Sequence, residues 1–231
     1  MDKWPIFIAA GALALAAGPA AANGGWHSTI TSGEPVVTGS GRVVKEVRPV
    51  GRFRDVELKG SANLQVELGR PLSLTVEADD NLLRHFTSNI EGGTLRLDTR
   101  GSFRTRSSPR IYLTAPNIEA LTTSGSGNLV ISGVANRQLQ LVTRGSGNLI
   151  ARGRTDMLTV KVQGSGNARL DDIQAGRADV SVHGSGNAWV KSNGAVRARS
   201  HGSGNVFVIG RPSSLDADQG GSGRVIRVGG R

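Results

Sequence analysis

The side chains best suited to chemistry in this sequence include two histidines in a repeated part of the chain. His183 and His201 each directly precede a Gly-Ser-Gly-Asn sequence, so we expect them to stack one repeat apart, with Gln163 one repeat earlier. Such a row would bind a metal ion or a sugar, yet zinc usually takes three or four ligands, and no carboxylate shares this register. We therefore favour two solvated histidines and predict no metal site and no cofactor.

Adjacent carboxylates at Asp171 and Asp172, with Asp156 one turn earlier in the repeat, raise the alternative of acid–base chemistry on a polysaccharide. Aspartate is, however, an ordinary turn residue. The chain contains no cysteine, and its recurrent serines lie in glycine-rich turns without a Gly-x-Ser-x-Gly elbow. We predict no catalytic residue and a non-enzymatic protein, and we keep a polysaccharide-active β-helix enzyme as an alternative.

Arginine dominates the charge of this sequence and gathers between residues 96 and 110. The net charge is +10, and 23 of the 28 basic residues are arginine. Arginine-rich surfaces favour anionic partners, such as an acidic glycan, lipid headgroups or another envelope component. No motif for reading nucleic acid is present, so we predict no specific nucleic-acid partner. The predicted anion-binding residues are Arg96, Arg100, Arg104, Arg106 and Arg110.

An internal repeat indicates the elements that would position these side chains. Gly-Ser-Gly-Asn occurs five times, with successive copies 20, 19, 20 and 18 residues apart, and a sixth copy reads Gly-Ser-Gly-Arg at 221–224. A flexible linker would not keep this spacing, whereas a stack of turns requires it. The predicted structural corners are Gly125, Gly127, Asn128, Gly145, Gly147, Asn148, Gly164, Gly166, Asn167, Gly184, Gly186, Asn187, Gly202, Gly204 and Asn205.

Apolar and polar residues alternate on both sides of each corner. Leu158, Val160 and Val162, for example, alternate with Thr159 and Lys161, which is typical of a strand with one buried face. A two-strand unit cannot bury that face alone, so the units must stack. We predict an all-β fold, a parallel β-solenoid with coils of about 19 residues and laddered corner asparagines, over a rival meander of antiparallel hairpins.

Two residues beyond each corner asparagine lies a row that contains two aromatic rings. If the residues on either side face inward, this row faces outward. Stacked Trp189 and Phe207 would suit a sugar or an interface between copies of the chain. We favour a homo-oligomer interface, or coverage of the row by residues 45–115, over a sugar site. The row consists of Val130, Ile150, Arg169, Trp189 and Phe207.

The first 22 residues have the layout of a secretory signal peptide. A polar start precedes the apolar run 6–17, and Ala20-Ala21-Ala22 supplies a cleavage site after Ala22. We expect a periplasmic or secreted protein with no later membrane-spanning segment. Residues 23–44 are interpreted as a flexible lead, 45–117 as an N-terminal β layer with a short helix over 82–87, and 118–231 as the repeat solenoid.

Several motifs, taken in order, resemble one protein family. They are Phe53 to Asn63, the strand Leu72–Val76, Asp80-Asn81-Leu82-Leu83, Gly93-Thr94-Leu95-Arg96-Leu97 and the repeated Gly-Ser-Gly-Asn. Together they are similar to the head-GIN-domain proteins, described as putative autotransporter adhesin heads, over roughly Val44 to Arg231. The resemblance implies an exported bacterial β-solenoid with no established catalytic residues.

Three functions follow from the sequence. The first is a structural or interaction module of the cell envelope that resembles an adhesin head. The second is a binding module for anionic glycan or lipid headgroups, carried by the five arginines. The third is the polysaccharide-active enzyme already named. Further candidate binding residues are His183, His201, Trp189 and Phe207.

Overall fold

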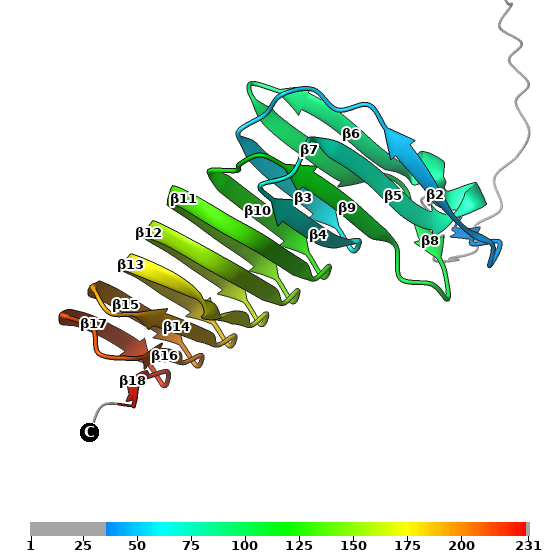
Figure 1. The fold of residues 1–231 in the computed structure, drawn as a ribbon. Helices are drawn as coiled ribbons and strands as arrows, with labels where there is room; N and C mark the ends of the chain where they lie inside the picture. The colour runs from blue at the N-terminus through cyan, green and yellow to red at the C-terminus, as the bar shows by residue number, and fades with distance from the viewer. Residues whose placement is uncertain (1–35, 230–231) are drawn as a thin grey trace, which may run out of the picture. The chain divides into compact units, whose positions relative to one another are not determined.

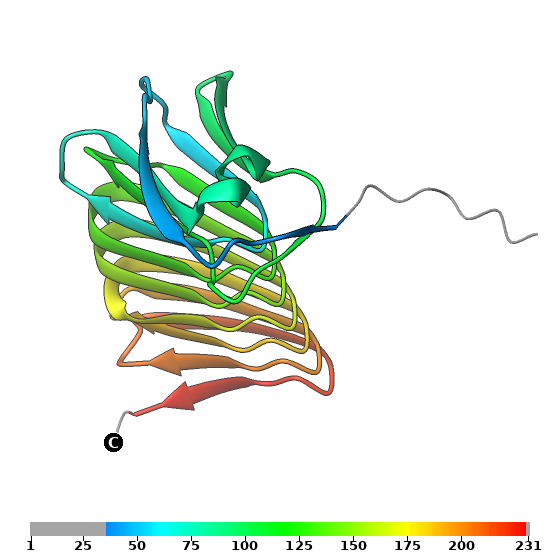
Figure 2. The same ribbon diagram turned by 90° about the vertical axis from the view of Figure 1, so that its right-hand side faces the viewer.

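Successive Gly-Ser-Gly-Asn corners lie in register, so the repeat forms one column of parallel β-coils (Figures 1 and 2). The structure is a computed structural model that describes residues 36–229. Gly125 pairs with Gly145 on the neighbouring strand, and Gly145 pairs in turn with Gly164. The predicted parallel β-solenoid is confirmed, and the rival meander of antiparallel hairpins is wrong for the repeat.

Two parallel ladders of strands form the walls of the column, one before the corners and one after them. The ladder before the corners runs through β7 (Thr94–Thr99), β3 (Asp55–Gly60), β10 (Ala120–Gly125), β11 (Leu129–Gly145), β12 (Leu149–Gly164), β13 (Ala168–Gly184), β15 (Ala195–Gly202) and β17 (Ser214–Gly221). The ladder after the corners runs through β9 (Arg110–Ala115), β4 (Asn63–Leu68), the first parts of β11, β12 and β13, then β14 (Ala188–Ser192), β16 (Val206–Ile209) and β18 (Val225–Val228).

A narrow aliphatic core fills the space between the two ladders. In β12, Leu158, Val160 and Val162 point inward with none of their surface exposed, while Lys161 faces outward. Full burial of a leucine or valine side chain stabilises a fold by about 1.5–3 kcal/mol relative to exposure. Repetition of this filling in coil after coil therefore stabilises a chain that has no cysteine for disulfides.

Near the N-terminal end, the coils follow a different order in space from their order in the chain. Gly60 pairs with Gly125, which makes Gly60-Ser61-Ala62-Asn63 the corner of a coil formed by β3 and β4. The coil of β7 and β9 stacks on the other side of it. Residues 55–68 and 94–115, expected in an N-terminal layer, thus belong to the same column as the repeat.

Antiparallel strands cover this end of the column. The strand β2 (Val43–Arg48) pairs with β5 (Ser73–Asp79), β5 pairs with β9, and β6 (Phe86–Glu91) pairs with β7. They pair the edges of the parallel ladders, which would otherwise expose free N–H and C=O groups. The helix expected over 82–87 is a 3-10 helix, η1 (Asp80–His85), that begins two residues earlier and joins β5 to β6.

The segment before β2 is also held in place. Residues 36–44, expected in a flexible lead, contain β1 (Val37–Thr38), which pairs in parallel with β8 (Phe103–Arg104), and the start of β2. The predicted signal peptide, residues 1–22, and residues 23–35 lie outside the described residues. Within residues 36–229, no helix has the length and hydrophobicity of a membrane span.

The corner glycines are required by contact between coils as well as by backbone angle. Gly145 has a φ of +124°, which residues with a Cβ rarely adopt. A Cβ on Gly145 would overlap the carbonyl oxygen of Gly125, and one on Gly147 would overlap that of Gly127. Neighbouring coils therefore approach too closely at the corner to admit a side chain, which explains why the two glycines recur.

The corner asparagines form the predicted ladder. Each donates its backbone N–H and its Nδ2–H to the Oδ1 of the asparagine one coil earlier, at 3.0 and 3.2 Å for Asn187 on Asn167. The ladder starts at Asn63 and ends at the backbone N–H of Arg224. These bonds satisfy corner N–H groups that no strand partner reaches.

Candidate functional site

The arginine-rich stretch forms a long loop, residues 100–109, which we call the arginine loop. It joins β7 to β9 and stands where the other coils have their corner, because Leu97 pairs with Leu58 and Arg110 pairs with Asn63. Ten residues replace the two, Ser61 and Ala62, that separate the strands of the neighbouring coil. The loop is thus an expanded corner at the capped end of the column.

A buried carboxylate fastens this loop to the cap. Asp79, at the end of β5, is 1% exposed. Its two carboxylate oxygens accept hydrogen bonds from the Thr105 hydroxyl at 2.8 Å and the Ser107 hydroxyl at 2.7 Å. On the same loop, the ring of Phe103 packs edge-on against Phe86 with centroids 5.7 Å apart. The loop is therefore anchored by both polar and apolar contacts.

Hydrogen bonding keeps Asp79 ionised although it is buried. The Ser107 hydroxyl is the main reason that the pKa of Asp79 lies below its ordinary value; burial opposes this shift, and the Thr105 hydroxyl and the Gly41 N–H add to it. A buried carboxylate without such donors would have a raised pKa instead. The ionised Asp79 carboxylate is therefore part of the loop's anchor, and its charge is stabilised by these hydrogen-bond donors.

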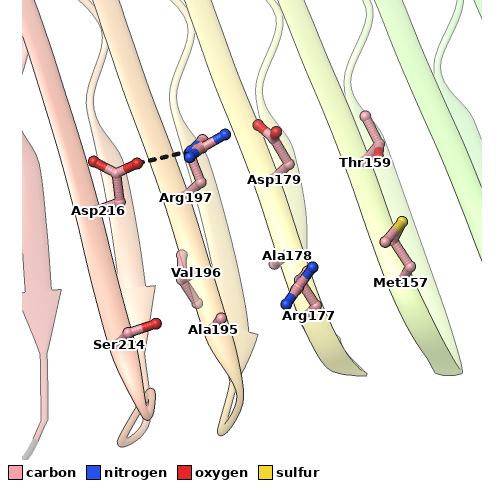
Figure 3. A pocket seen from close by; sticks show the side chains of 10 residues that line it. All are labelled: Met157, Thr159, Arg177, Ala178, Asp179, Ala195, Val196, Arg197, Ser214 and Asp216. Carbon is pink, nitrogen blue, oxygen red and sulfur yellow. Dashed lines mark hydrogen bonds and ion pairs between the residues drawn. The ribbon is translucent and has the colours of Figure 1, made fainter.

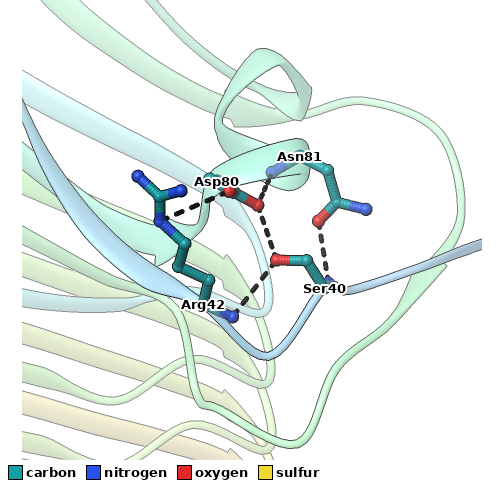
Figure 4. Close-up of polar contacts among 4 residues, drawn as sticks. All are labelled: Ser40, Arg42, Asp80 and Asn81. Atoms are coloured by element: carbon teal, nitrogen blue, oxygen red, sulfur yellow. Dashed lines mark hydrogen bonds and ion pairs between the residues drawn. The ribbon is translucent and has the colours of Figure 1, made fainter.

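The segment before β2 crosses next to this anchor (Figure 4). The Ser40 hydroxyl donates to Asp80 at 2.5 Å, and the Ser40 backbone N–H donates to the Asn81 side chain at 3.0 Å. Arg42 lies 3.7 Å from the Asp80 carboxylate and donates its backbone N–H to the Ser40 hydroxyl. One residue before Ser40, the Gly39 N–H donates to the Arg104 carbonyl at 2.7 Å, so this segment also holds the loop.

Two of the five predicted arginines belong to ion pairs on the strands and not to the loop. Arg96, in β7, lies 3.3 Å from Glu91 and 3.8 Å from Glu57. Arg110, the first residue of β9, lies 3.6 Å from Glu77. Their charges are largely compensated within the protein, so they are poor candidates for an external anion.

The other three predicted arginines lie on the loop or at its start and remain uncompensated. Arg100, Arg104 and Arg106 are all exposed, and within residues 36–229 no carboxylate lies within 4.0 Å of their guanidinium groups. Arg104 and Arg106 border an open hollow of about 360 Å³ whose inner wall includes Asp79. The structure thus divides the five predicted arginines, which the sequence could not tell apart, into three without an ion pair and two with one.

The histidine pair stacks as predicted, but its geometry does not suit a metal. The rings of His183 and His201 are 5.3 Å apart and inclined by 10°. Lone pairs of imidazole nitrogens lie in the ring plane, so those of parallel stacked rings cannot converge on one ion. Among the described residues, no three histidine or acidic side chains gather as metal ligands. As expected, no carboxylate shares the register of this row, in which His201 pairs with Gly220; Asp218, which pairs with Arg199, approaches His201 diagonally at 3.7 Å.

The aromatic row faces outward, and its rings stack on one another. Trp189 and Phe207 are 5.1 Å apart and inclined by 8°, and the guanidinium carbon of Arg169 lies 5.9 Å from the Trp189 ring centre. Both faces of Trp189 are thus occupied, so a sugar cannot stack on that ring. Coverage by residues 45–115 is wrong, because those strands extend the column at its end.

The paired carboxylates are tied to separate arginines. Asp171 lies 3.6 Å from Arg169, and Asp172 lies 3.3 Å from Arg152. Both aspartates belong to β13, where its register against β12 shifts, and not to the turn expected there. Both side chains lie outside the core, between the buried residues Leu170 and Ile173, and each is paired with a different arginine, so they are not free to act as the carboxylate pair that glycoside hydrolysis needs.

A further hollow, of about 370 Å³, lies on the wall before the corners and was not anticipated from the sequence (Figure 3). Its floor is formed by the small residues Ala178 and Ala195, and Arg197 pairs with Asp216 across one side at 2.7 Å. The recess lies where the small side chains of Ala178, Ala195 and Ser214 come together on neighbouring strands.

Comparison with known families decides what kind of protein carries these features. A family profile described as "Putative auto-transporter adhesin, head GIN domain" matches residues 52–212. The chain belongs to this family. The family places the chain among adhesin-like head domains and confirms the resemblance that the sequence motifs indicate. The five Gly-Ser-Gly-Asn corners and the arginine loop of this head GIN chain fall within the matched residues. A comparison with curated proteins finds no match.

Solved structures share the head GIN fold at low sequence identity. A putative adhesin from Bacteroides fragilis is 17% identical with a TM-score of 0.69, covering 83% of this chain and 100% of that one. A putative adhesin from Parabacteroides distasonis is 18% identical with a TM-score of 0.56, and a putative lipid binding protein from the same species is 21% identical with a TM-score of 0.54. Each covers 84% of this chain and 100% of its own. The TM-scores show a shared fold, and at these identities the likeness shows the fold alone.

Proposed function

We propose that this protein is an exported, non-catalytic interaction module of the bacterial cell envelope, and that it binds an anionic glycan through the arginine loop. Family membership supports the adhesin-like role. The proposal for the ligand rests on one observation, the three exposed guanidinium groups of Arg100, Arg104 and Arg106, which no carboxylate of the described residues compensates.

Guanidinium groups suit this role because they bind carboxylate and sulfate oxygens through paired N–H donors. The loop is anchored at Thr105 and Ser107, so Arg104 and Arg106 are displayed from a backbone that does not have to be ordered when the ligand binds. Less ordering on binding means a smaller entropic cost. Arg104 and Arg106 line the same hollow, so an extended acidic polymer can contact both.

The experiment compares two double variants that remove equal charge. Arg104→Ala/Arg106→Ala removes uncompensated cations, and Arg96→Ala/Arg110→Ala removes ion-paired ones. Binding to immobilised heparin, an anionic glycan probe, is measured for both against the wild type, with neutral dextran as the blank. We expect the loop variant to lose about tenfold or more in affinity and the strand variant to change by less than about threefold.

Salt dependence provides a second readout in the same assay. Wild-type binding should weaken by about tenfold between about 0.05 M and about 0.3 M sodium chloride, because salt screens charges exposed to solvent. Equal losses of affinity in the two double variants, or an affinity that does not change with salt concentration, would refute the arginine loop as the binding region.

A further inference from the structure

A third hollow opens at the edge of the column away from the corners, where β9 ends and β10 begins. Its volume is about 480 Å³, which lies in the range of small-molecule sites. It exists because the turn after Ala115 and the segment before β3 meet there without a continuous strand to close the edge. This hollow is distinct from the arginine loop, which lies at the corner edge.

The floor of the hollow is apolar and continuous with the core. Ala115 and Ile118 are 1% and 0% exposed, and the half-buried side chains of Phe53 and Leu72 pack against the same core. Apolar side chains left open to water in a concave site are a recurrent mark of ligand binding. The hollow therefore has room and affinity for an alkyl chain.

The rim of the hollow is basic. Arg52 and Arg54 flank Phe53 in the chain, both are exposed, and in the described part of the chain neither has a carboxylate within 4.0 Å. One acid, Glu119, lines the hollow, and its backbone N–H donates to the Arg54 carbonyl at 2.9 Å without an ion pair between the side chains. Two cations against one anion leave the rim with a net positive charge.

We infer that this hollow binds a single-chain amphiphile with an anionic head, such as a fatty acid. The alkyl chain would cover the half-buried side chains of Phe53 and Leu72, and the carboxylate would lie at Arg52 and Arg54. Apolar contact supplies affinity, and charge-assisted hydrogen bonds to guanidinium fix the orientation. This inference does not depend on glycan binding, because none of the loop arginines lines the hollow.

The first test uses the wild-type protein and three probes in calorimetric titrations. Decanoate carries both the chain and the anionic head, acetate carries only the head, and decyltrimethylammonium carries the chain with the opposite charge. We expect one decanoate per chain, with affinity at least about tenfold above that of each other probe. Equal binding of decanoate and decyltrimethylammonium, or no saturable decanoate binding, would overturn the inference.

The second test locates the site with charge-reversal variants. Arg52→Glu/Arg54→Glu should weaken decanoate binding by about tenfold or more, and Arg154→Glu/Arg177→Glu, which makes the same change in net charge at exposed arginines elsewhere, should leave it within about twofold. Equal weakening in the two variants would show a general charge effect and reject the site. Heparin binding by Arg52→Glu/Arg54→Glu should be unchanged. A failure of the fatty-acid site can therefore be distinguished from a failure of glycan binding by the arginine loop.

Discussion

Asn148 donates both its backbone N–H and its side-chain Nδ2–H to the Oδ1 of Asn128, at 3.0 and 3.1 Å. One oxygen thus receives two donors from the next coil, and the same arrangement recurs along the corner edge. The ladder couples coils that are 18–20 residues apart in sequence. It explains why asparagine follows the second glycine at five corners, and the arginine of the sixth corner stands where the ladder ends.

Removal of one rung should therefore destabilise the column. In Asn167→Ala, the backbone and side-chain donors of Asn187 lose their acceptor, and we expect the free energy of unfolding to fall by about 1–3 kcal/mol. Asn89→Ala, at an exposed position of β6 with no such bond, is the matched control. Urea unfolding of both variants is the measurement, and similar small losses would contradict the ladder.

The corner glycines should tolerate a methyl group less well than glycines in open turns. Gly145→Ala combines a φ of +124° with overlap against Gly125, and we expect it to lose about 2–4 kcal/mol. Gly92→Ala, with a φ of +57° and no atom within 4 Å of its Cβ, should lose about 1 kcal/mol. Thermal melts that rank the two variants equally would mean that coils do not touch at the corner.

Local periodicity explains why the solenoid could be predicted from sequence. The regular recurrence of Gly145 and its equivalents sets the coil length, and the alternation around Val160 sets which face is buried. Both signals are local and repeat several times. The stacking of His183 on His201 and of Trp189 on Phe207 then follows from the register alone.

The capped end and the state of the arginines could not be predicted in this way. That Arg96 meets Glu57 and Arg110 meets Glu77 depends on pairing between strands that are remote in the chain. The anchoring of the loop by Asp79 likewise joins β5 to residues more than 25 positions away. No short-range pattern encodes such contacts, so the five arginines appeared equivalent.

Stability should depend on the ionisation of Asp79 at acid pH. Its folded-state pKa is lowered, chiefly by the Ser107 hydrogen bond, so its contribution is fully present above the ordinary pKa of 3.8 and is lost as the pH falls through the folded-state value. We expect Asp79→Asn to cost about 1–2 kcal/mol at neutral pH. The difference in melting temperature between wild type and variant should shrink below pH 3.8; a difference that stays constant down to pH 2 would contradict this linkage.

The aromatic stack should appear as a coupling energy. A double-mutant cycle with Trp189→Ala and Phe207→Ala is expected to give an interaction of about 0.5–1.5 kcal/mol, because stacked rings contribute beyond their separate burial. Chemical unfolding of the two single variants and the double variant measures it. Additive losses would mean that the rings do not interact.

The central claim, that the arginine loop is the glycan-binding region, is tested most directly by mapping the contact residue by residue. In a titration of isotope-labelled protein with a heparin oligosaccharide, followed by amide NMR, we predict that the largest shift changes fall on residues 100–109 and on the segment around Gly39 that supports them. Changes concentrated instead around Trp189 or in the recess at Arg197 would contradict the claim.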